Sequence, residues 1–419
     1  MRLRTLALAL LAAGALPAAP AEAVPADVPL VRMRDGHGSD LFFRLDPRTL
    51  QQVGRPIRTF RGGSDLRVSP DGGMLAFADP WQRGRRGARI HFVDLAGWRS
   101  TGVARVGRYG WLVLGWASED RLVAVADDGP GRRHLIWVNA KSRKVLARRP
   151  FSGWLVDTVP VPGGLGVVVG PSEGAGPLRV LLADEHGGIR TIRVDGIRAG
   201  AEYAESSDPA GQVLTPAVTV DPETGRLHVV AARGLLVAEV ELASGAVEYH
   251  SLGASASKGN VGVWWRHAAW AGEGRIAVTG DHWPPVRGRH APPGPVPVPF
   301  GLRMIDASDW SIATLDARTD SMHVAEGAVL ASGTRFFNRG RRTESTGLLG
   351  FDDAGHRAYT RFRGRQVALL GSRGSLGYVW VRKTRTAHVI DLAGGRTLHT
   401  IRTGRRAPSL LSPTPAPAP

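Results

Sequence analysis

The sequence contains no cysteine in its 419 residues. This excludes disulfide bonds, thiolate metal ligands, cysteine nucleophiles and a lipoprotein anchor. Lysine is scarce, so arginine supplies nearly all of the 54 basic residues. Beyond the N-terminal segment no apolar run reaches the ~20 residues that a membrane-spanning helix needs. We therefore expect a mature chain with no transmembrane segment, whose fold is held by packing and hydrogen bonds alone.

The composition is otherwise that of a globular protein, with 43% hydrophobic and 22% charged residues. Glycine (54) and proline (29) are abundant, which indicates many turns. The formal net charge of +17 favours binding to polyanions. Part of the arginine content is compositional, because the Arg, Ala and Gly bias is typical of a GC-rich bacterial genome.

The N-terminus is predicted to be a secretory signal peptide, residues 1–23. Arg2 and Arg4 precede an apolar run from Leu6 to Leu16, and Ala21-Glu22-Ala23 supplies an A-x-A cleavage site. No Arg-Arg pair is present, which favours the general secretory route over the twin-arginine route. We therefore expect a secreted, extracellular protein, for which nucleic acid is not an expected partner. Residues 412–419 are Pro, Ala, Ser and Thr only and are predicted to be a disordered tail.

The strongest internal signal is a repeat. A short β-type run ends in an acidic or amide residue, a small polar turn follows, and the next strand begins. Two more apolar runs precede most of these positions, so the unit is four short strands in about 40–50 residues. Eight such anchor residues occur, at spacings of 39 to 65 residues: Asp46, Asp94, Asn139, Asp184, Glu241, Asp306, Asp352 and Asp391.

This repeat predicts an all-β fold, a β-propeller over residues 24–411. A four-stranded sheet that is apolar on both faces cannot be buried alone, and stacking such sheets around an axis buries both faces. Eight anchors favour eight blades; seven is the alternative, if the N-terminal hairpin lies outside the ring. The ring of blades must also close, and the N-terminus enters at a second strand of its blade. We expect the missing first strand near Pro408-Ser409-Leu410-Leu411, paired with the strand near Leu30-Val31-Arg32-Met33.

Three stretches resemble known bacterial repeats. Ser69-Pro70-Asp71-Gly72, followed by Gly73-Met74-Leu75-Ala76-Phe77, resembles the turn and strand of TolB-type WD40-like repeats. Asp221-Pro222-Glu223-Thr224-Gly225 with its following strand, and Val389-Ile390-Asp391-Leu392, are similar to YVTN-type repeats. The resemblance implies a propeller and carries no catalytic residues, because such propellers host many functions.

Catalytic and metal-binding motifs are sparse. Ser255-x-x-Lys258 lacks the partner motifs of penicillin-recognising enzymes. Asp281, His282 and His290 lie in or beside a Pro-rich segment without a spacing that fixes metal geometry. We therefore predict no metal, no cofactor and no assigned catalytic residue, and we expect a monomer.

The candidate ligand-binding residues belong to one face. In a propeller the loops between second and third strands emerge on the same side as the blade-to-blade connections. The sequence predicts that this face binds an anionic envelope polymer, a glycan or a lipid head group, with a protein partner as another reading. The leading hypothesis is a secreted, non-catalytic binding or scaffold protein; the alternative is an extracellular hydrolase or lyase acting on a glycan or lactone. The candidates are Trp81, Arg83, Arg85, Arg86, Arg132, Arg133, Trp283, Arg287, Arg289, Arg339, Arg341 and Arg342.

Overall fold

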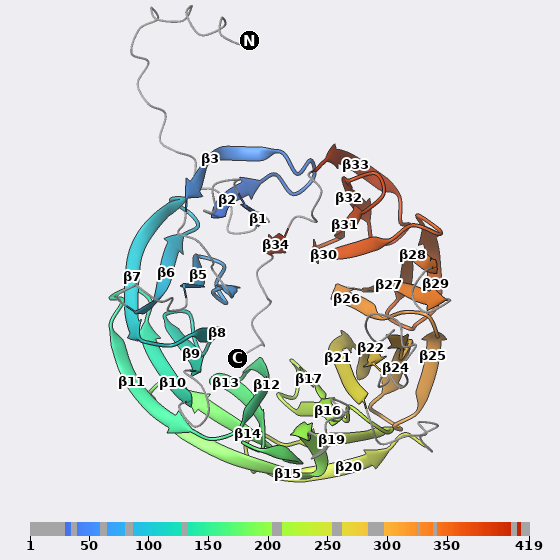
Figure 1. Cartoon of the computed structure of the whole chain (residues 1–419). Helices are drawn as coiled ribbons and strands as arrows, with labels where there is room; N and C mark the ends of the chain where they lie inside the picture. The colour runs from blue at the N-terminus through green and yellow to red at the C-terminus, as the bar shows by residue number, and fades with distance from the viewer. Residues whose placement is uncertain are drawn as a thin grey trace, which may run out of the picture.

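The computed structural model describes residues 30–34, 40–58, 65–79, 87–127, 133–202, 212–253, 262–283, 297–325, 327–337, 342–403 and 409–411. These residues form a ring of β-sheets around a central axis (Figure 1). In each blade the first strand lies nearest the axis and the fourth lies on the outside. The fold is therefore the all-β propeller that the repeat predicts.

The first four blades follow the chain from its N-terminal side. Blade 1 contains β34 (Ser409–Leu411), β1 (Leu30–Arg34), β2 (Asp40–Leu45) and β3 (Gln52–Arg58). Blade 2 contains β4 (Leu66–Val68), β5 (Met74–Asp79), β6 (Ala88–Asp94) and β7 (Arg99–Gly107). Blade 3 contains β8 (Trp111–Trp116), β9 (Arg121–Asp127), β10 (Arg133–Asn139) and β11 (Val145–Phe151). Blade 4 contains β12 (Trp154–Val161), β13 (Gly164–Gly170), β14 (Gly174–Asp184) and β15 (Ile189–Glu202).

The remaining blades complete the circle. Blade 5 contains β17 (Ala217–Val220), β18 (Leu227–Val230), β19 (Leu236–Val240) and β20 (Val247–Ser251). Blade 6 contains β21 (Gly262–Gly272), β22 (Arg275–Trp283), β24 (Leu302–Asp306) and β25 (Ile312–Asp316), with the short β23 (Val298–Pro299) beside β22. Blade 7 contains β26 (Ser321–Ala325), β27 (Ala328–Phe337), β28 (Arg342–Asp352) and β29 (Arg357–Arg361). Blade 8 contains β30 (Val367–Arg373), β31 (Leu376–Val381), β32 (Thr386–Asp391) and β33 (Thr397–Arg402).

A separate apolar cluster fills each contact between adjacent blades. In β13, for example, Leu165 and Val167 pack against blade 3, whereas Val168 packs against blade 5. This alternation explains why the middle strands are apolar along their whole length. Each fully buried aliphatic side chain contributes on the order of 1.5–3 kcal/mol. The stability of any one blade therefore depends on both of its neighbours.

The eight anchor residues end the third strand of their blades. Their side-chain oxygens accept hydrogen bonds from backbone N–H groups of the following turn, as Asx turns do. Asp184 Oδ1, for example, accepts from the N–H groups of His186 and Gly188, both at 2.8 Å. The same kind of bond is made by Asp46, Asp94, Asn139, Glu241, Asp306, Asp352 and Asp391.

The residue four positions after an anchor contacts the outer strand of the preceding blade. The indole of Trp98 in blade 2 donates to the carbonyl of Arg55 in β3 at 2.6 Å. Trp310 in blade 6 stacks on His250 in β20, with 3.8 Å between ring centroids. Several turns hold a non-glycine residue at positive φ here, a costly conformation that the contact across the blades offsets: Leu50 (54°), Trp98 (47°), Arg143 (60°) and Trp310 (58°).

At Gly395, four positions after the anchor of blade 8, the side chain in the contact comes from the preceding blade. A Cβ atom at this position would lie 2.4 Å from the ring of Tyr359 in β29 of blade 7. The backbone φ of Gly395 is 63°. Glycine is required here because the preceding blade supplies the filling side chain.

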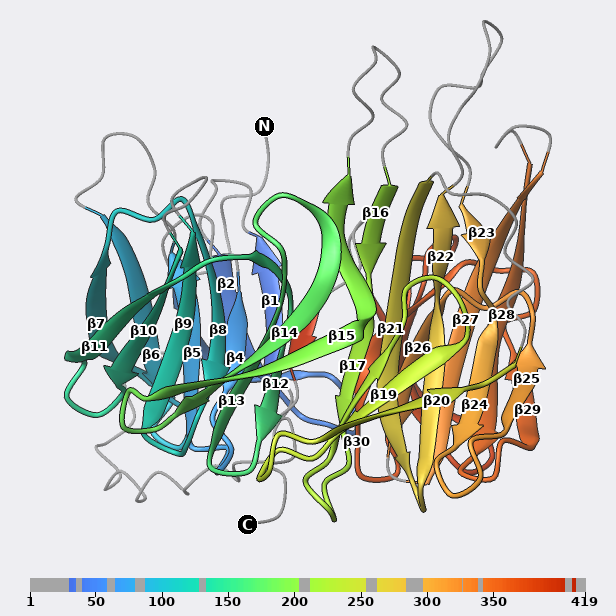
Figure 2. The same ribbon diagram turned by 90° about the horizontal axis from the view of Figure 1, so that it is seen from below.

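One strand lies outside the four-stranded pattern. β16 (Gln212–Thr215) pairs antiparallel with the end of β15 and parallel with β21. Blade 4 and blade 6 thereby join into a ten-stranded sheet that passes blade 5 (Figure 2). Leu214 packs with Ala232 and Trp264 in a small cluster below this connection. The four-strand repeat of the sequence does not predict this strand.

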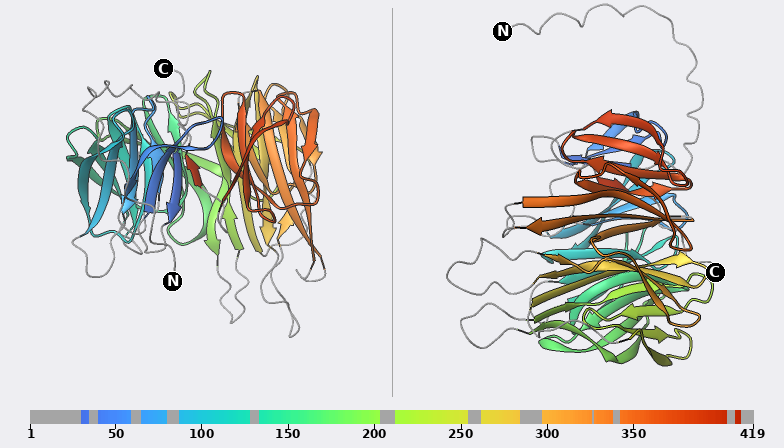
Figure 3. Two further views of the ribbon diagram at one scale, coloured as in Figure 1. Left: turned by 90° about the horizontal axis from the view of Figure 1, so that it is seen from above. Right: turned by 90° about the vertical axis from the view of Figure 1, so that its right-hand side faces the viewer.

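Two faces of the ring are distinguished by their turns. The anchor turns lie on one, which we call the anchor face. The connections between blades and the turns between second and third strands lie on the other, which we call the connection face. β15, β16, β21, β22, β27 and β28 extend furthest on the connection face (Figures 2 and 3). Blades 4, 6 and 7 therefore rise above the others there.

The ring closes by pairing of the two ends of the chain, as the sequence predicts. Leu30, Val31 and Arg32 of β1 pair antiparallel with residues 409–411 of β34. β34 lies closest to the axis within blade 1 (Figure 1). The last described residues thus complete the blade that the first described residues begin.

Deleting residues 405–419 should lower the melting temperature by about 5 °C or more, because blade 1 loses its innermost strand and the ring loses its closure. Deleting only residues 412–419 is the matched control and should leave the melting temperature within about 1 °C of the full chain. Differential scanning calorimetry measures both. Equal melting temperatures for the two deletions would contradict a stabilising role for β34.

Candidate functional site

Most of the predicted ligand residues lie outside the described residues. Three have a described backbone, and all three belong to strands and not to loops as predicted. Arg133 begins β10, Arg342 begins β28, and Trp283 ends β22, because these strands extend further than their apolar cores indicate. The residues outside the described part are Trp81, Arg83, Arg85, Arg86, Arg132, Arg287, Arg289, Arg339 and Arg341.

Arg133 takes part in a contact between blades 3 and 4. Its Nε donates to Asp127 Oδ2 at 2.8 Å, and Nη1 donates to the carbonyl of Gly153. The side chains of Arg133 and Asp127 are 19% and 20% exposed. The charge of Arg133 is therefore compensated by Asp127, which leaves it a poor ligand for a second anion.

One basic cluster of the connection face is described in full. The turn between β31 and β32 places Arg382, Lys383 and Arg385 in exposed positions. Only Arg382 bonds a side chain, Gln366, at 3.0 Å. Exposed cations of this kind attract polyanions over a Debye length of about 8–10 Å.

A tryptophan–carboxylate group occupies the connection face at blade 6. In the β21–β22 hairpin Trp265 is opposite Asp281 and Val263 is opposite Trp283, so these side chains share one face of the hairpin. That face points toward blade 7, since Thr279 on it donates to the carbonyl of Thr319 at 3.3 Å. Trp265 is 50% exposed, which is unusual for so large an apolar side chain.

Asp281 is the titratable centre of this group. Burial and, to a lesser extent, the nearby carboxyl of Asp320 in blade 7 raise its pKa to about 6, against the opposing effect of Arg266. Asp281 Oδ1 is buried and has no hydrogen-bond partner among the described residues. Burial also raises the pKa of Asp320, whose Oδ2 accepts from the N–H of Thr334 at 3.0 Å. Within the described part of the chain, Asp281 Oδ1 is thus an acceptor without a donor.

Blade 3 contains the same tryptophan–carboxylate pair, but there an arginine bonds the carboxylate. Trp111, 41% exposed, lies opposite Asp127 in the β8–β9 hairpin, which corresponds to Trp265 opposite Asp281. In blade 3 Arg133 bonds the carboxylate. Blade 6 therefore differs from blade 3, because Asp281 Oδ1 has no donor among the described residues.

The opposite face of the β21–β22 hairpin points toward blade 5. Trp264 stacks on His282 with 3.7 Å between ring centroids, and Trp264 is only 5% exposed. Arg266 lies on this face, 5.8 Å from the Trp264 ring. A single hairpin thus presents an exposed aromatic face to blade 7 and a buried aromatic, cationic face to blade 5.

A serine–histidine contact joins the inner strands of blades 7 and 8. Ser372 Oγ and His323 Nε2 are 2.7 Å apart. Both side chains are partly buried, and burial lowers the pKa of His323, so the imidazole is neutral at pH 7. Gly371, beside Ser372, has open space where a Cβ would lie. A neutral imidazole bonded to a hydroxyl is the arrangement of a general base and a nucleophile.

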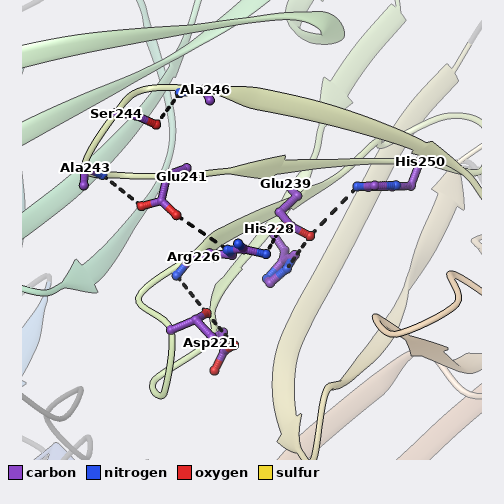
Figure 4. A network of polar contacts seen from close by, with 10 residues as sticks. Asp221, Arg226, His228, Glu239, Glu241, Ala243, Ser244, Ala246 and His250 are labelled. Carbon is purple, nitrogen blue, oxygen red and sulfur yellow. Dashed lines mark hydrogen bonds and ion pairs between the residues drawn. The ribbon is translucent and has the colours of Figure 1, made fainter.

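Blade 5 contains a polar network between strands (Figure 4). Glu239 Oε2 lies 3.8 Å from His228 Nε2 and 3.9 Å from His250 Nε2, and Arg226 bonds Glu239 Oε1 at 2.5 Å. Burial lowers the pKa of His228 to about 4, so this histidine is neutral at pH 7. Trp270 and Trp310 stack against the two histidines at the contact with blade 6. The network therefore belongs to the packing between blades.

The described part of the chain contains neither a cluster of metal ligands nor a membrane-spanning helix. No group of three or more His, Asp or Glu side chains there has the arrangement to hold a metal ion. No helix in that part is long and apolar enough to cross a membrane.

Asp281→Asn should stabilise the protein at pH 8 by about 1–3 kcal/mol and have almost no effect near pH 4. Because the folded pKa of about 6 exceeds the ordinary value of 3.8, the wild type gains stability as pH falls through 6 and the gain is complete below 3.8. Urea unfolding across this range measures the effect. The same change at the exposed Asp195 is the control; a pH-independent effect of Asp281→Asn would contradict the burial of its charge.

Comparison with known proteins identifies the fold. No protein-family model matches the chain, and no curated protein matches it in sequence, so the likeness to TolB-type and YVTN-type repeats stays a prediction. Among solved structures, dihydro-heme d1 dehydrogenase NirN in complex with DHE is 16% identical, with a TM-score of 0.58 over 94% of this chain and 77% of that one. Apo AztD from Citrobacter koseri is 11% identical, with a TM-score of 0.53 over 91% of this chain and 96% of that one. At such identities the similarity establishes the β-propeller fold alone.

Proposed function

We propose that this protein is a carbohydrate-binding propeller that recognises an anionic glycan of the cell envelope on its connection face. Sugar rings stack on Trp265 and Trp283, and Asp281 accepts hydrogen bonds from sugar hydroxyls. The protein acts outside the cytoplasm, as its N-terminal segment predicts. Arginines of the connection-face loops bind the anionic groups of the same polymer.

The observation that carries this proposal is the half-exposed Trp265 opposite Asp281, whose Oδ1 has no hydrogen-bond donor among the described residues. An aromatic ring next to an open acceptor supplies both contacts that a sugar makes, an apolar ring face and polar edges. Asp281 and Asp320 would repel an anionic group placed directly against them. The sugar ring therefore belongs at Trp265, and the charged substituents belong at the arginine loops around it.

Trp265→Ala should weaken glycan binding roughly tenfold, since truncating a central aromatic contact typically costs more than 1 kcal/mol. Titration calorimetry with teichoic acid, polygalacturonate and neutral dextran measures this, with phosphatidylglycerol vesicles as a fourth probe. Replacing Arg85, Arg86, Arg341 and Arg342 together with Ser should reduce the salt dependence of binding to the charged polymers.

Trp111→Ala is the matched control, because Trp111 is similarly exposed, at 41% against 50%, but its opposite carboxylate is bonded to Arg133. This variant should bind like the wild type. Equal losses in Trp265→Ala and Trp111→Ala, or binding to the vesicles alone, would contradict the proposal.

The contact between Ser372 and His323 favours a second candidate function, hydrolysis of an ester or lactone. Ser372 Oγ would attack the carbonyl carbon while His323 Nε2 takes its proton. The proton then passes to the leaving oxygen as the C–O bond breaks. Water, activated by the same imidazole, attacks the acyl-serine and releases the acid, which restores the serine. The supporting observations are the 2.7 Å contact and the neutral imidazole.

A fluorophosphonate probe tests this function, since an activated serine forms a P–O bond with it and expels fluoride. We expect labelling of the wild type at Ser372, no labelling of Ser372→Ala, and at least tenfold slower labelling of His323→Gln. Ser321→Ala, on the same strand as His323, should label normally. Mass spectrometry identifies the modified residue. An unlabelled wild type, or labelling elsewhere, would rule out this activity.

A further inference from the structure

Two arginines stack on one phenyl ring between blades 5 and 6. The guanidinium carbon of Arg266 lies 3.7 Å from the centroid of Phe300, and that of Arg303 lies 4.0 Å from it. Arg266 comes from β21 and Arg303 from β24, so the site joins the first and third strands of blade 6. It lies on the hairpin face opposite to Trp265.

The backbone around Phe300 holds this arrangement in place. The N–H of Phe300 donates to the carbonyl of Gly280 at 2.8 Å. Gly280 has a φ of 149°, and a Cβ there would lie 2.0 Å from the carbonyl oxygen of Trp265. Only glycine allows β21 and β22 to approach this closely. The backbone of Phe300 is therefore held against the β21–β22 hairpin, which places its ring beside Arg266 and Arg303.

Among the described residues, neither positive charge has an ion-pair partner. Arg266 is 4% exposed and its Nη1 donates only to the carbonyls of Trp265 and Asp281, at 3.1 and 3.4 Å. The Nε atoms of Arg266 and Arg303 are buried without a hydrogen bond, and neither guanidinium pairs with a carboxylate of the described residues. Buried charges normally have such partners, because an unpaired buried charge is costly.

The electrostatics agree with this uncompensated state. Burial and, to a lesser extent, the charge of Arg303 lower the pKa of Arg266 to about 9. Burial also lowers the pKa of Arg303. Asp281 attracts Arg266, but its own carboxyl is protonated more readily than usual and it forms no ion pair with the arginine. The protein alone therefore leaves net positive charge at this position.

We infer that Arg266 and Arg303 form an anion site that binds a tetrahedral or planar oxyanion, the phosphate or carboxylate class, at the edge of Phe300. The two guanidinium carbons are at most about 8 Å apart, by way of the ring centroid. A phosphate that accepts charge-assisted hydrogen bonds of ~2.8 Å from two guanidinium groups holds their carbons roughly this far apart. Arg303 is partly exposed, so an ion can reach the site. The bound oxyanion supplies the counter-charge that the fold lacks.

This inference stands apart from the proposed glycan binding at Trp265, because the two sites lie on opposite faces of the β21–β22 hairpin. Free phosphate and a phosphate group of an envelope polymer would make the same contacts with the two arginines. The two sources are separated by titrating inorganic phosphate and teichoic acid in parallel. Binding of free phosphate identifies a small-ion site; binding of the polymer alone identifies an anchor for its phosphates. The effect of Trp265→Ala on glycan binding can hold or fail without affecting either result.

The experiment compares melting temperatures in phosphate and in chloride at equal ionic strength, with titration calorimetry for affinity. We expect phosphate or teichoic acid to raise the wild-type melting temperature by several degrees. Arg303→Met should bind the anion at least tenfold more weakly. In chloride the same variant should melt higher than the wild type, because it removes the repulsion between the two arginines.

Arg357→Met is the matched control. Arg357 also stacks on a phenylalanine, Phe351, at 5.4 Å, but it bonds Asp316 at 3.0 Å. This variant should melt lower than the wild type in chloride and keep the full anion response. The inference is overturned if neither anion shifts the wild-type melting temperature, if Arg303→Met keeps the full response, or if Arg303→Met melts lower in chloride, as a purely packing role would require.

Discussion

The structure depends on one constraint: each four-stranded sheet is apolar on both faces and only a neighbouring sheet can bury them. Every contact between blades accordingly contains its own cluster of aliphatic and aromatic side chains. Polar links reinforce these contacts, such as the Trp137 indole of blade 3 donating to the carbonyl of Asp184 in blade 4 at 2.6 Å. With no disulfide to hold the ends, the ring requires a noncovalent closure, which β34 provides.

Blade 6 departs from the regular pattern, and both its Trp265–Asp281 group and its Arg266–Phe300 group follow from that departure. Its first two strands are long enough to rise beyond the apolar core, so residues there face solvent or polar neighbours. One face of the hairpin exposes Trp265 beside Asp281; the other confines Arg266 against Phe300. In blade 3 the corresponding carboxylate is bonded to Arg133. The repeating fold thus supplies a rigid support, and local changes in strand length and pairing supply the chemistry.

The repeat was predictable because its cause is local. An acidic side chain at the end of a strand caps the turn that follows, so Asp94 and Asp306 identify strand ends without knowledge of the fold. The pairing of β34 with β1 followed from the need to complete a blade. Trp283 was expected in a loop, because polar residues conceal the extension of β22. Arg266 and Arg303 were missed since a single arginine in an apolar strand does not differ, in sequence, from a solvated one. β16 was missed because its partner β21 is some fifty residues away.

The parallel pairing of β16 with β21 has a consequence for folding. Blade 5 is flanked by two blades that are joined to each other through backbone hydrogen bonds, so it cannot separate from the ring while that pairing persists. Blades 4, 5 and 6 therefore constitute one cooperative unit, or foldon, in an otherwise modular protein. We expect their amides to exchange with solvent in a single opening event. The same pairing should confine duplication or loss of a blade to the rest of the ring.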